Sequence, residues 1–278
     1  MIPSFLYGTA WKEERTAALT TLALRAGFVG IDTANQRKHY FEAGVGEGIA
    51  AAIEAGVVTR EQLFLQTKFT YQRGQDHRLP YDPAARPAEQ VRQSFAKSLE
   101  QLRTTYLDSL VLHGPELRSG LTDTDREVWA TMSALVDEGC VRHIGVSNVA
   151  PDQLALLFEA EGHAPRFVQN RCYARLGWDA EVRALCGEHD VIYQGFSLLT
   201  ANTKALSHPD VRTIAQRHGA TIPQVVFAFA RAVGMLPLTG TSDPKHMAQD
   251  LEAMTLTLTP EEVEHMGDIA ISPPSRHA

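Results

Sequence analysis

Short apolar runs alternate with amphipathic segments along the whole chain. Tyr106–His113 is almost continuously apolar, as is typical of a strand buried on both faces of a parallel sheet. Arg15–Ala26 instead has apolar residues at helical spacing on one face, and Gly27 ends the segment. The expected strands are Phe5–Gly8, Val29–Asp32, Leu63–Lys68, Tyr106–His113, His143–Val146, Phe167–Gln169, Val191–Phe196 and Met235–Leu238.

A helical segment follows each of these strands. The expected helices are Arg15–Ala26, Glu42–Ala55, Pro87–Leu102, Thr122–Glu138, Pro151–Glu161, Asp179–His189, Asp210–His218, Ile222–Val233, Pro244–Ala253 and Pro260–Ala270. Eight such units in 278 residues predict an α/β fold, a (β/α)8 TIM barrel of eight parallel strands with closing helices at the C-terminal end. No linker divides the chain, so we expect one catalytic domain over residues 1–278.

An open, doubly wound sheet is the main alternative fold. It predicts a GxGxxG phosphate loop after an early strand, and none occurs there. The glycine-rich stretch Gly44-Val45-Gly46-Glu47-Gly48 has a different spacing and lies at the start of a helix. The barrel is therefore the better interpretation.

Charge and cysteine content exclude several classes of protein. The net charge of -7 comes without a basic stripe, so we expect no nucleic-acid partner. No apolar run is long enough to span a bilayer, and the first residues lack the pattern of a signal peptide. Cys140, Cys172 and Cys186 have no CxxC spacing, which indicates reduced thiols and no metal site. These features predict a cytoplasmic enzyme.

Chemically active residues stand where three successive strands end. Asp32, Lys68 and His113 occupy the carboxyl ends of strands two, three and four, the edge at which barrels of this kind carry their active sites. Singly, the acid could cap a turn, the lysine could be solvated and the imidazole could bond a turn. Together they favour a functional site, because a buried lysine needs a carboxylate partner.

These strand-end residues resemble those of the aldo-keto reductase superfamily, over nearly the whole chain. The segments that carry the resemblance are Gly30-Ile31-Asp32-Thr33-Ala34, Lys68, Leu112-His113, Gly145-Val146-Ser147-Asn148 and Gln169. The resemblance implies an NAD(P)H-dependent reductase of small aldehydes or ketones, with Asp32, Tyr40, Lys68 and His113 as the catalytic residues. Tyr40 would protonate the carbonyl oxygen, and Lys68 would lower the phenol pKa from its usual ~10. Asp32 would hold Lys68, and His113 would orient the carbonyl.

The resemblance also implies a nicotinamide-binding groove. Ser147, Asn148 and Gln169 would hold the carboxamide, and Phe196 would stack on the ring where many relatives have tyrosine. The other expected cofactor-binding residues are Gly8, Thr9, Ala10, Ser197, Leu198, Thr239, Gly240, Thr241, Ser242, His246, Gln249 and Asp250.

Two departures from the family pattern bear on the chemistry. At the commoner spacing after the aspartate stands Arg37, so Tyr40 requires an insertion within Asn35–His39. His39 and Tyr7 are the alternative acids.

The second departure lies after strand eight, where the lysine and arginine common in NADP-preferring relatives are missing. Ser242, Lys245 and His246 near a helix N-terminus could take the 2′-phosphate instead. We predict NADP(H) as cofactor, with NAD(H) as the alternative.

The substrate is less well defined. Trp11 and His113 are expected to contact it, with further wall residues from Tyr71, Tyr81 and Gly114–Leu121, while the short tail Ser272–Ala278 would add little to a lid. Two other functions remain open: a Schiff-base aldolase that uses Lys68, and a non-catalytic nucleotide-binding regulatory subunit. The resemblance makes a monomer the expected state.

Overall fold

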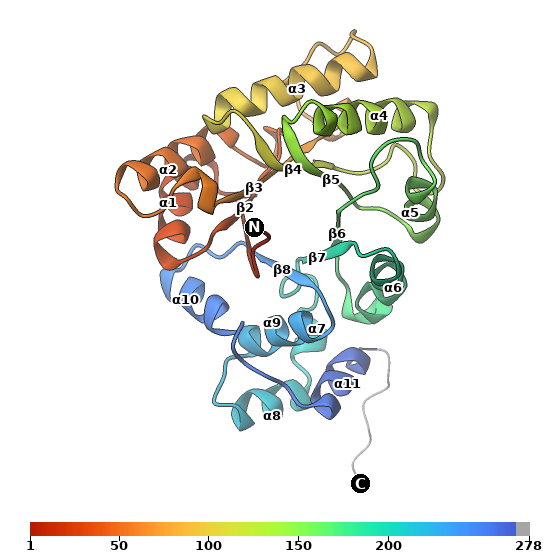
Figure 1. Cartoon of the computed structure of the whole chain (residues 1–278). Helices are drawn as coiled ribbons and strands as arrows, with labels where there is room; N and C mark the ends of the chain where they lie inside the picture. Colours follow the sequence, from red (N-terminus) through yellow and green to blue (C-terminus); the bar gives the residue numbers. More distant parts are fainter. Residues whose placement is uncertain (271–278) are drawn as a thin grey trace.

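Eight parallel strands close into a barrel in the computed structural model, which describes residues 1–270 (Figure 1). Each strand pairs with the next along the chain, and β1 pairs with β8. The strands are β1 (Leu6–Gly8), β2 (Gly30–Asp32), β3 (Phe64–Phe69), β4 (Leu107–Leu112), β5 (Val141–Ser147), β6 (Phe167–Arg171), β7 (Ile192–Phe196) and β8 (Leu236–Thr239). The predicted (β/α)8 barrel is confirmed.

Helices surround the barrel, as the ring of ribbons in Figure 1 shows. They are α1 (Thr16–Ala26), α2 (Glu42–Glu54), α3 (Pro87–Leu102), α4 (Asp123–Asp137), α5 (Pro151–Phe158), α6 (Ala180–Glu188), α7 (Thr203–Leu206), α8 (Pro209–Arg217), α9 (Ile222–Ala232), α10 (Pro244–Glu252) and α11 (Pro260–Asp268). Short 3₁₀ turns are η1 (Glu13–Arg15), η2 (Arg60–Gln62), η3 (Gln72–Gly74) and η4 (Ala174–Asp179).

Most elements begin or end one to three residues away from the predicted position. Strand β5 begins two residues early at Val141, because Val141 pairs with Leu107 of β4. Helix α6 begins at Ala180 and not at Asp179, which has a left-handed φ of 57° and accepts hydrogen bonds from Asn170 and Tyr193. The four-residue helix α7 was not predicted, because so short a segment carries no readable period.

The barrel interior is layered. Leu6, Phe64, Phe167 and Leu236 form a separate apolar cluster near the amino ends of their strands. Because side chains alternate along a strand, residues two positions further on also face inward. Phe64 is thus followed by Gln66 and then by Lys68 along β3. The interior therefore changes from apolar to polar toward the carboxyl ends of the strands.

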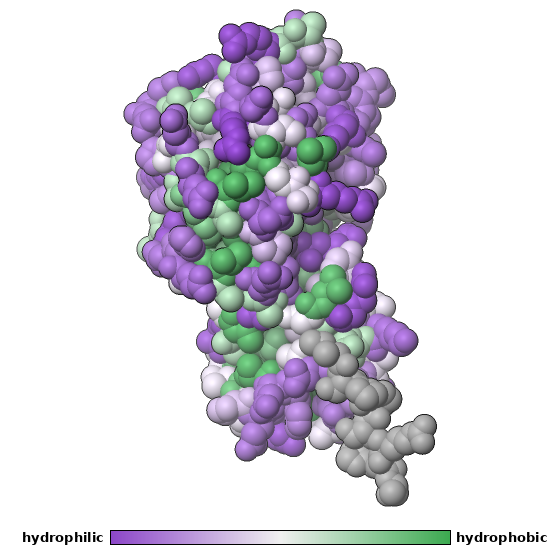
Figure 2. Space-filling view, turned by 90° about the vertical axis from the view of Figure 1, so that its right-hand side faces the viewer, coloured by the Kyte–Doolittle hydropathy of each residue, from purple (hydrophilic) through white to green (hydrophobic). Residues whose placement is uncertain are grey.

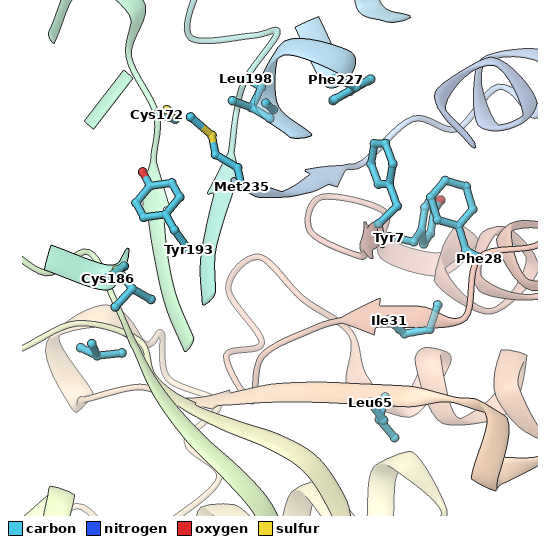
Figure 3. Packing of buried hydrophobic residues seen from close by; sticks show 14 of the residues in the cluster. Tyr7, Phe28, Ile31, Leu65, Cys172, Cys186, Tyr193, Leu198, Phe227 and Met235 are labelled. Atoms are coloured by element: carbon cyan, nitrogen blue, oxygen red, sulfur yellow. The ribbon is translucent and has the colours of Figure 1, made fainter. Parts of the chain in front are cut away.

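A larger apolar core lies between the barrel and its helices. Figure 3 shows part of it, with Tyr7 of β1 beside Phe28, whose rings are 5.5 Å apart between centroids. The outer surface is mainly polar on the face drawn in Figure 2, with only small green areas between hydrophilic side chains. Within residues 1–270, no helix has both the length and the apolar character needed to cross a membrane.

Candidate active site

An ion pair between Asp32 and Lys68 lies at the centre of the site, at the carboxyl ends of β2 and β3. The Lys68 Nζ atom donates to Asp32 Oδ1 at 2.6 Å, to Asp32 Oδ2 at 2.7 Å and to the Thr33 carbonyl at 2.8 Å. Both charged side chains are buried, Lys68 with 1% exposure and Asp32 with 2%. An ammonium group has three protons, so all its donors are used within this cluster.

Tyr40 lies directly beside this pair, at the end of the loop that follows β2. The loop turns at Gln36, whose carbonyl accepts from the backbone N–H groups of His39 and Tyr40. The Tyr40 ring centroid is 5.4 Å from Lys68 Nζ, and 6.1 Å from the centroid of His113. The longer loop therefore places a phenol next to both the lysine and the histidine.

Arg37, which stands at the commoner spacing, and the two alternative acids, His39 and Tyr7, have other contacts. Arg37 pairs with Glu13 at 3.2 Å. The His39 ring lies against Trp11, with 4.1 Å between centroids. The Tyr7 hydroxyl donates to the Thr241 carbonyl at 3.0 Å, and the Tyr7 ring belongs to the larger apolar core between the barrel and its helices. None of these contacts places the side chain beside Lys68.

His113 is held as a neutral imidazole. Its Nδ1 lies 2.7 Å from the Thr70 hydroxyl oxygen. Burial, and then the positive charges of Lys68 and His39, lowers the His113 pKa to about 3. Within residues 1–270, Nε2 has no hydrogen-bond partner. If Nδ1 accepts from Thr70, Nε2 carries the proton and is free to donate it to a ligand.

Tyr40 differs from the sequence-based expectation in its acidity. Burial, and then the negative charge of Asp32, raises the Tyr40 pKa above its ordinary value. We expected Lys68 to lower it. The Asp32 carboxylate instead neutralises the ammonium at short range, so the phenol experiences little net positive charge. For Lys68 the direction is the reverse: burial lowers its pKa, and the negative charge of Asp32 acts against this and raises it. Tyr40 is thus protonated at neutral pH, the form that a general acid needs.

A groove of about 560 Å³ runs from this cluster across the barrel mouth to α10. Its lining includes most of the expected residues: Gly8, Ala10, Ser147, Gln169, Phe196, Ser197, Leu198, Thr239, Gly240, Thr241, Ser242, His246, Gln249 and Asp250. Trp11, expected to contact substrate, also lines it. The groove thus gathers residues from the ends of seven strands and from α9 and α10, and Lys68 at the end of β3 adds the eighth strand to the site.

Two expected cofactor residues lie outside this lining. Thr9 is fully buried, and its hydroxyl donates to the Asp32 carbonyl at 3.0 Å. Asn148 faces a neighbouring cavity instead, and its Nδ2 donates to the His113 carbonyl at 2.8 Å and to Ser147 Oγ at 3.1 Å. Asn148 also has a left-handed φ of 52°. Both residues therefore support the site from beside or beneath it.

Three cations in the groove were missed from the sequence: Lys12, Arg15 and Arg171. Lys12 is buried, and its Nζ donates to the Gly240 carbonyl at 2.7 Å. Burial, and then the charge of Arg15, lowers the Lys12 pKa to about 8. The sequence feature that could have indicated Lys12 is its place in the loop directly after the first strand. These cations make the middle of the groove suitable for an anionic ligand.

The start of α10 is less suited to a phosphate than the sequence suggested. Asp243 Oδ1 accepts from the Lys245 backbone N–H at 2.7 Å and from that of His246 at 3.3 Å. These backbone bonds hold the Asp243 pKa below its usual value. A carboxylate of this chain already occupies the helix N-terminus, where a negative group is favoured. Lys245 is also outside the groove lining.

Among residues 1–270, no group of three His, Cys, Asp or Glu side chains is arranged to hold a metal ion. The three cysteines are free, and burial raises the pKa values of Cys172 and Cys186 to about 12.

The barrel carries a polar groove at the carboxyl ends of its strands, and the comparisons identify the family of the protein. The sequence profile of the aldo/keto reductase family matches residues 6–271. An aldo-keto reductase of Mycobacterium avium is 32% identical over 252 residues, which cover 91% of this chain and 80% of that protein. Prostaglandin F synthase 1 of Bos taurus is 25% identical over 294 residues, covering 95% and 86%.

Solved structures agree with this assignment. The aldo/keto reductase of Brucella melitensis superposes with a TM-score of 0.81 at 26% identity, covering 96% of this chain and 95% of that one. The Bombyx mori aldo-keto reductase in complex with NADP has the same fold, with a TM-score of 0.81 at 23% identity over 96% and 89% of the chains. This chain belongs to the aldo/keto reductase family of NAD(P)H-dependent oxidoreductases. The predicted family membership and the NADP(H) cofactor of that family are confirmed.

Proposed function

We propose that this protein reduces small aldehydes or ketones to alcohols, with Tyr40 as the general acid. The observation that carries the proposal is the position of Tyr40, whose ring lies 5.4 Å from Lys68 Nζ and 6.1 Å from the His113 ring at one end of the groove. A phenol, a neutral imidazole and a buried ion pair at one point are the groups that carbonyl reduction requires.

The residues divide the work as follows. A bound reduced nicotinamide would supply the hydride. His113 Nε2 donates a hydrogen bond to the carbonyl oxygen and orients it. Tyr40 then gives its proton to that oxygen as negative charge develops on it. The Lys68 ammonium lies beside the resulting phenolate, and Asp32 keeps the ammonium in place. Trp11 lines the groove and is 69% exposed, so it would contact the substrate.

The groove residues fit a nicotinamide dinucleotide. Ser147 and Gln169 would contact the carboxamide, and Phe196 would stack on the ring. Lys12 and Arg15 would neutralise the phosphates between the two nucleosides.

We propose NADPH as the preferred cofactor, by a small margin. His246 lines the far end of the groove and offers a ring N–H as a hydrogen-bond donor, whereas the carboxylate of Asp243 at the same helix start opposes an added phosphate.

The test is a spectrophotometric panel of aldehydes and ketones, run in parallel with NADPH and NADH. We expect carbonyl-dependent loss of the reduced cofactor, and loss of most of this turnover in Tyr40→Phe with cofactor binding retained. A Tyr40→Phe enzyme with wild-type turnover would disprove the role of Tyr40. Binding without turnover against every carbonyl would instead indicate the regulatory-subunit alternative.

The Schiff-base alternative has little support. A nucleophilic lysine must present a free amine, yet Lys68 is 1% exposed and donates to three oxygens. The single domain over 1–278, the monomeric state and the cytoplasmic location stay predictions.

A further inference from the structure

A second cavity, of about 550 Å³, lies beside His113. It opens between the loops that follow β3 and β4, and the start of α5. His113, Thr70 and Asn148 form part of its wall. His113 is the one lining residue that this cavity shares with the cofactor groove. A molecule whose carbonyl oxygen meets His113 can therefore extend into this cavity, away from the cofactor.

The cavity carries unpaired positive charge. Arg73 and Arg118 line it, and among residues 1–270 neither has a carboxylate within 4.0 Å. Within residues 1–270, the Arg73 guanidinium donates one hydrogen bond, to the Pro115 carbonyl, and the Arg118 guanidinium donates none. The one acidic lining residue, Glu116, accepts from the Thr122 hydroxyl at 2.7 Å. Two guanidinium groups thus face one carboxylate.

We infer that this cavity binds the anionic end of the substrate, so that the preferred substrates are aldehydes or ketones that also carry a carboxylate. The inference rests on the proposed reductase function. A guanidinium offers a planar pair of N–H donors that matches a carboxylate, and arginine keeps its charge at every relevant pH. Arg73 and Arg118 approach from different loops, so they can hold the carboxylate while His113 holds the carbonyl.

The experiment compares 4-oxobutanoate with its methyl ester, an aldehyde pair that differs in one charge. At low ionic strength we expect kcat/KM to favour the acid by about tenfold, and salt to reduce the difference. Arg73→Gln and Arg118→Gln should each lower this ratio severalfold. Arg175→Gln, at an exposed arginine of η4 outside the cavity, is the matched control and should leave the ratio unchanged.

An ester with the same kcat/KM as the acid would overturn the inference. So would arginine variants whose acid-to-ester ratio equals that of the wild type. Failure of the proposed function looks different, because neither compound nor any neutral aldehyde would then oxidise NADPH.

A separate observation concerns three buried glutamines inside the barrel. Gln66 of β3, Gln169 of β6 and Gln194 of β7 are each no more than 3% exposed, and all lie at the level of Asp32. Gln66 Nε2 donates to Asp32 Oδ1 at 2.7 Å, and Gln169 Nε2 donates to the same atom at 3.0 Å. A glutamine side chain in a barrel interior is costly to bury unless its amide is bonded.

The direction of each bond follows from chemistry. An ionised carboxylate can only accept, so Gln66 and Gln169 must both direct their N–H groups at Asp32. Gln194 Oε1 accepts from the same two groups at 2.8 and 2.9 Å, and Gln194 Nε2 returns a bond to Gln66 Oε1 at 3.0 Å. Within residues 1–270, Gln169 Oε1 alone among these amide oxygens has no donor, and Gln169 lines the cofactor groove.

We propose that Gln66 and Gln194 are positioning residues that act through Asp32 and Gln169. Gln66 helps to hold the carboxylate that fixes Lys68. Gln194 fixes the amide of Gln169 so that its oxygen is left as an acceptor for the N–H groups of a bound carboxamide. The proposal depends on the proposed cofactor site, and it links that site to the proton-transferring residues.

Gln66→Leu and Gln194→Leu, each close to the wild type in volume, test this. For Gln194→Leu we expect the Kd of the oxidised cofactor, measured by tryptophan fluorescence, to rise about tenfold, because Gln169 loses one acceptor. For Gln66→Leu we expect the acidic limb of the kcat/KM profile to move to higher pH, because Asp32 loses a donor. Variants that only lower Tm, with wild-type Kd and pH profile, would reduce both residues to a structural role and refute the proposal. A wild type that binds no cofactor would instead refute the proposed function.

Discussion

Removing the Asp32 carboxylate tests the central ion pair through stability. In Asp32→Ala, Lys68 stays 1% exposed and keeps one acceptor, the Thr33 carbonyl. An unpaired charge of this kind costs about 3–5 kcal/mol. Gln66 and Gln169 also lose their shared acceptor, but each keeps its bond to Gln194 and adds less. For a chain of this size, the loss corresponds to a fall in Tm of roughly 6–20 °C.

The stability difference between Asp32→Ala and the wild type should depend on pH. Burial already lowers the Lys68 pKa in the folded protein, and loss of the carboxylate lowers it further. An unfolded lysine titrates near ~10.4, so between the folded pKa and that value the unfolded chain binds more protons. Stability then rises with pH across this window. The gap between Asp32→Ala and the wild type should therefore narrow as the pH approaches 10.

The assay is urea unfolding of four proteins at several pH values. They are the wild type, Asp32→Ala, Lys68→Met and the double variant, because the double variant removes both charges. We expect the double variant to be more stable at neutral pH than Asp32→Ala alone. If Asp32→Ala loses less than about 1 kcal/mol, or if the double variant is no better, Lys68 is not a buried charge that depends on Asp32.

Two further predictions concern the groove. Asp243→Asn keeps a helix cap but removes a negative charge, so the kcat/KM ratio of NADPH to NADH should rise about fivefold, the equivalent of about 1 kcal/mol; an unchanged ratio would place the 2′-phosphate elsewhere. Lys12 is charged below its pKa of about 8, so cofactor affinity should fall as the pH rises through that value. Lys12→Met should weaken binding about tenfold and remove this pH dependence; a persistent dependence would assign it to another group.

Much of the site could be predicted because barrels place strand-end side chains at one edge. Asp32, Lys68 and His113 each follow a recognisable apolar strand, so their meeting follows from the fold. Tyr40 was harder, since its position depends on how the loop from Asn35 turns, and several loop lengths leave the same flanking pattern. The carbonyl of Gln36 sets that turn in the structure.

Other features depend on contacts between distant parts of the chain. Lys12 is buried because its ammonium reaches the carbonyl of Gly240, 228 positions away. The sequence showed a lysine in a loop, with no sign of that partner. In the sequence, Asp243 is an ordinary helix cap. The structure shows that the helix it caps contributes to the end of the groove, where its charge can affect cofactor binding.

The sequence alone predicted the barrel and the strand-end positions of Asp32, Lys68 and His113, because periodicity and strand ends are local properties. It also predicted Tyr40 as the acid, by resemblance to a family and not from a strand end. The tertiary structure decided which polar side chains share the interior. Gln66, Gln169 and Gln194 come from three strands, and their register brings them to one level with Asp32. It also decided the acidity of Tyr40, because burial and the pairing of Lys68 with Asp32 depend on packing that no single segment encodes.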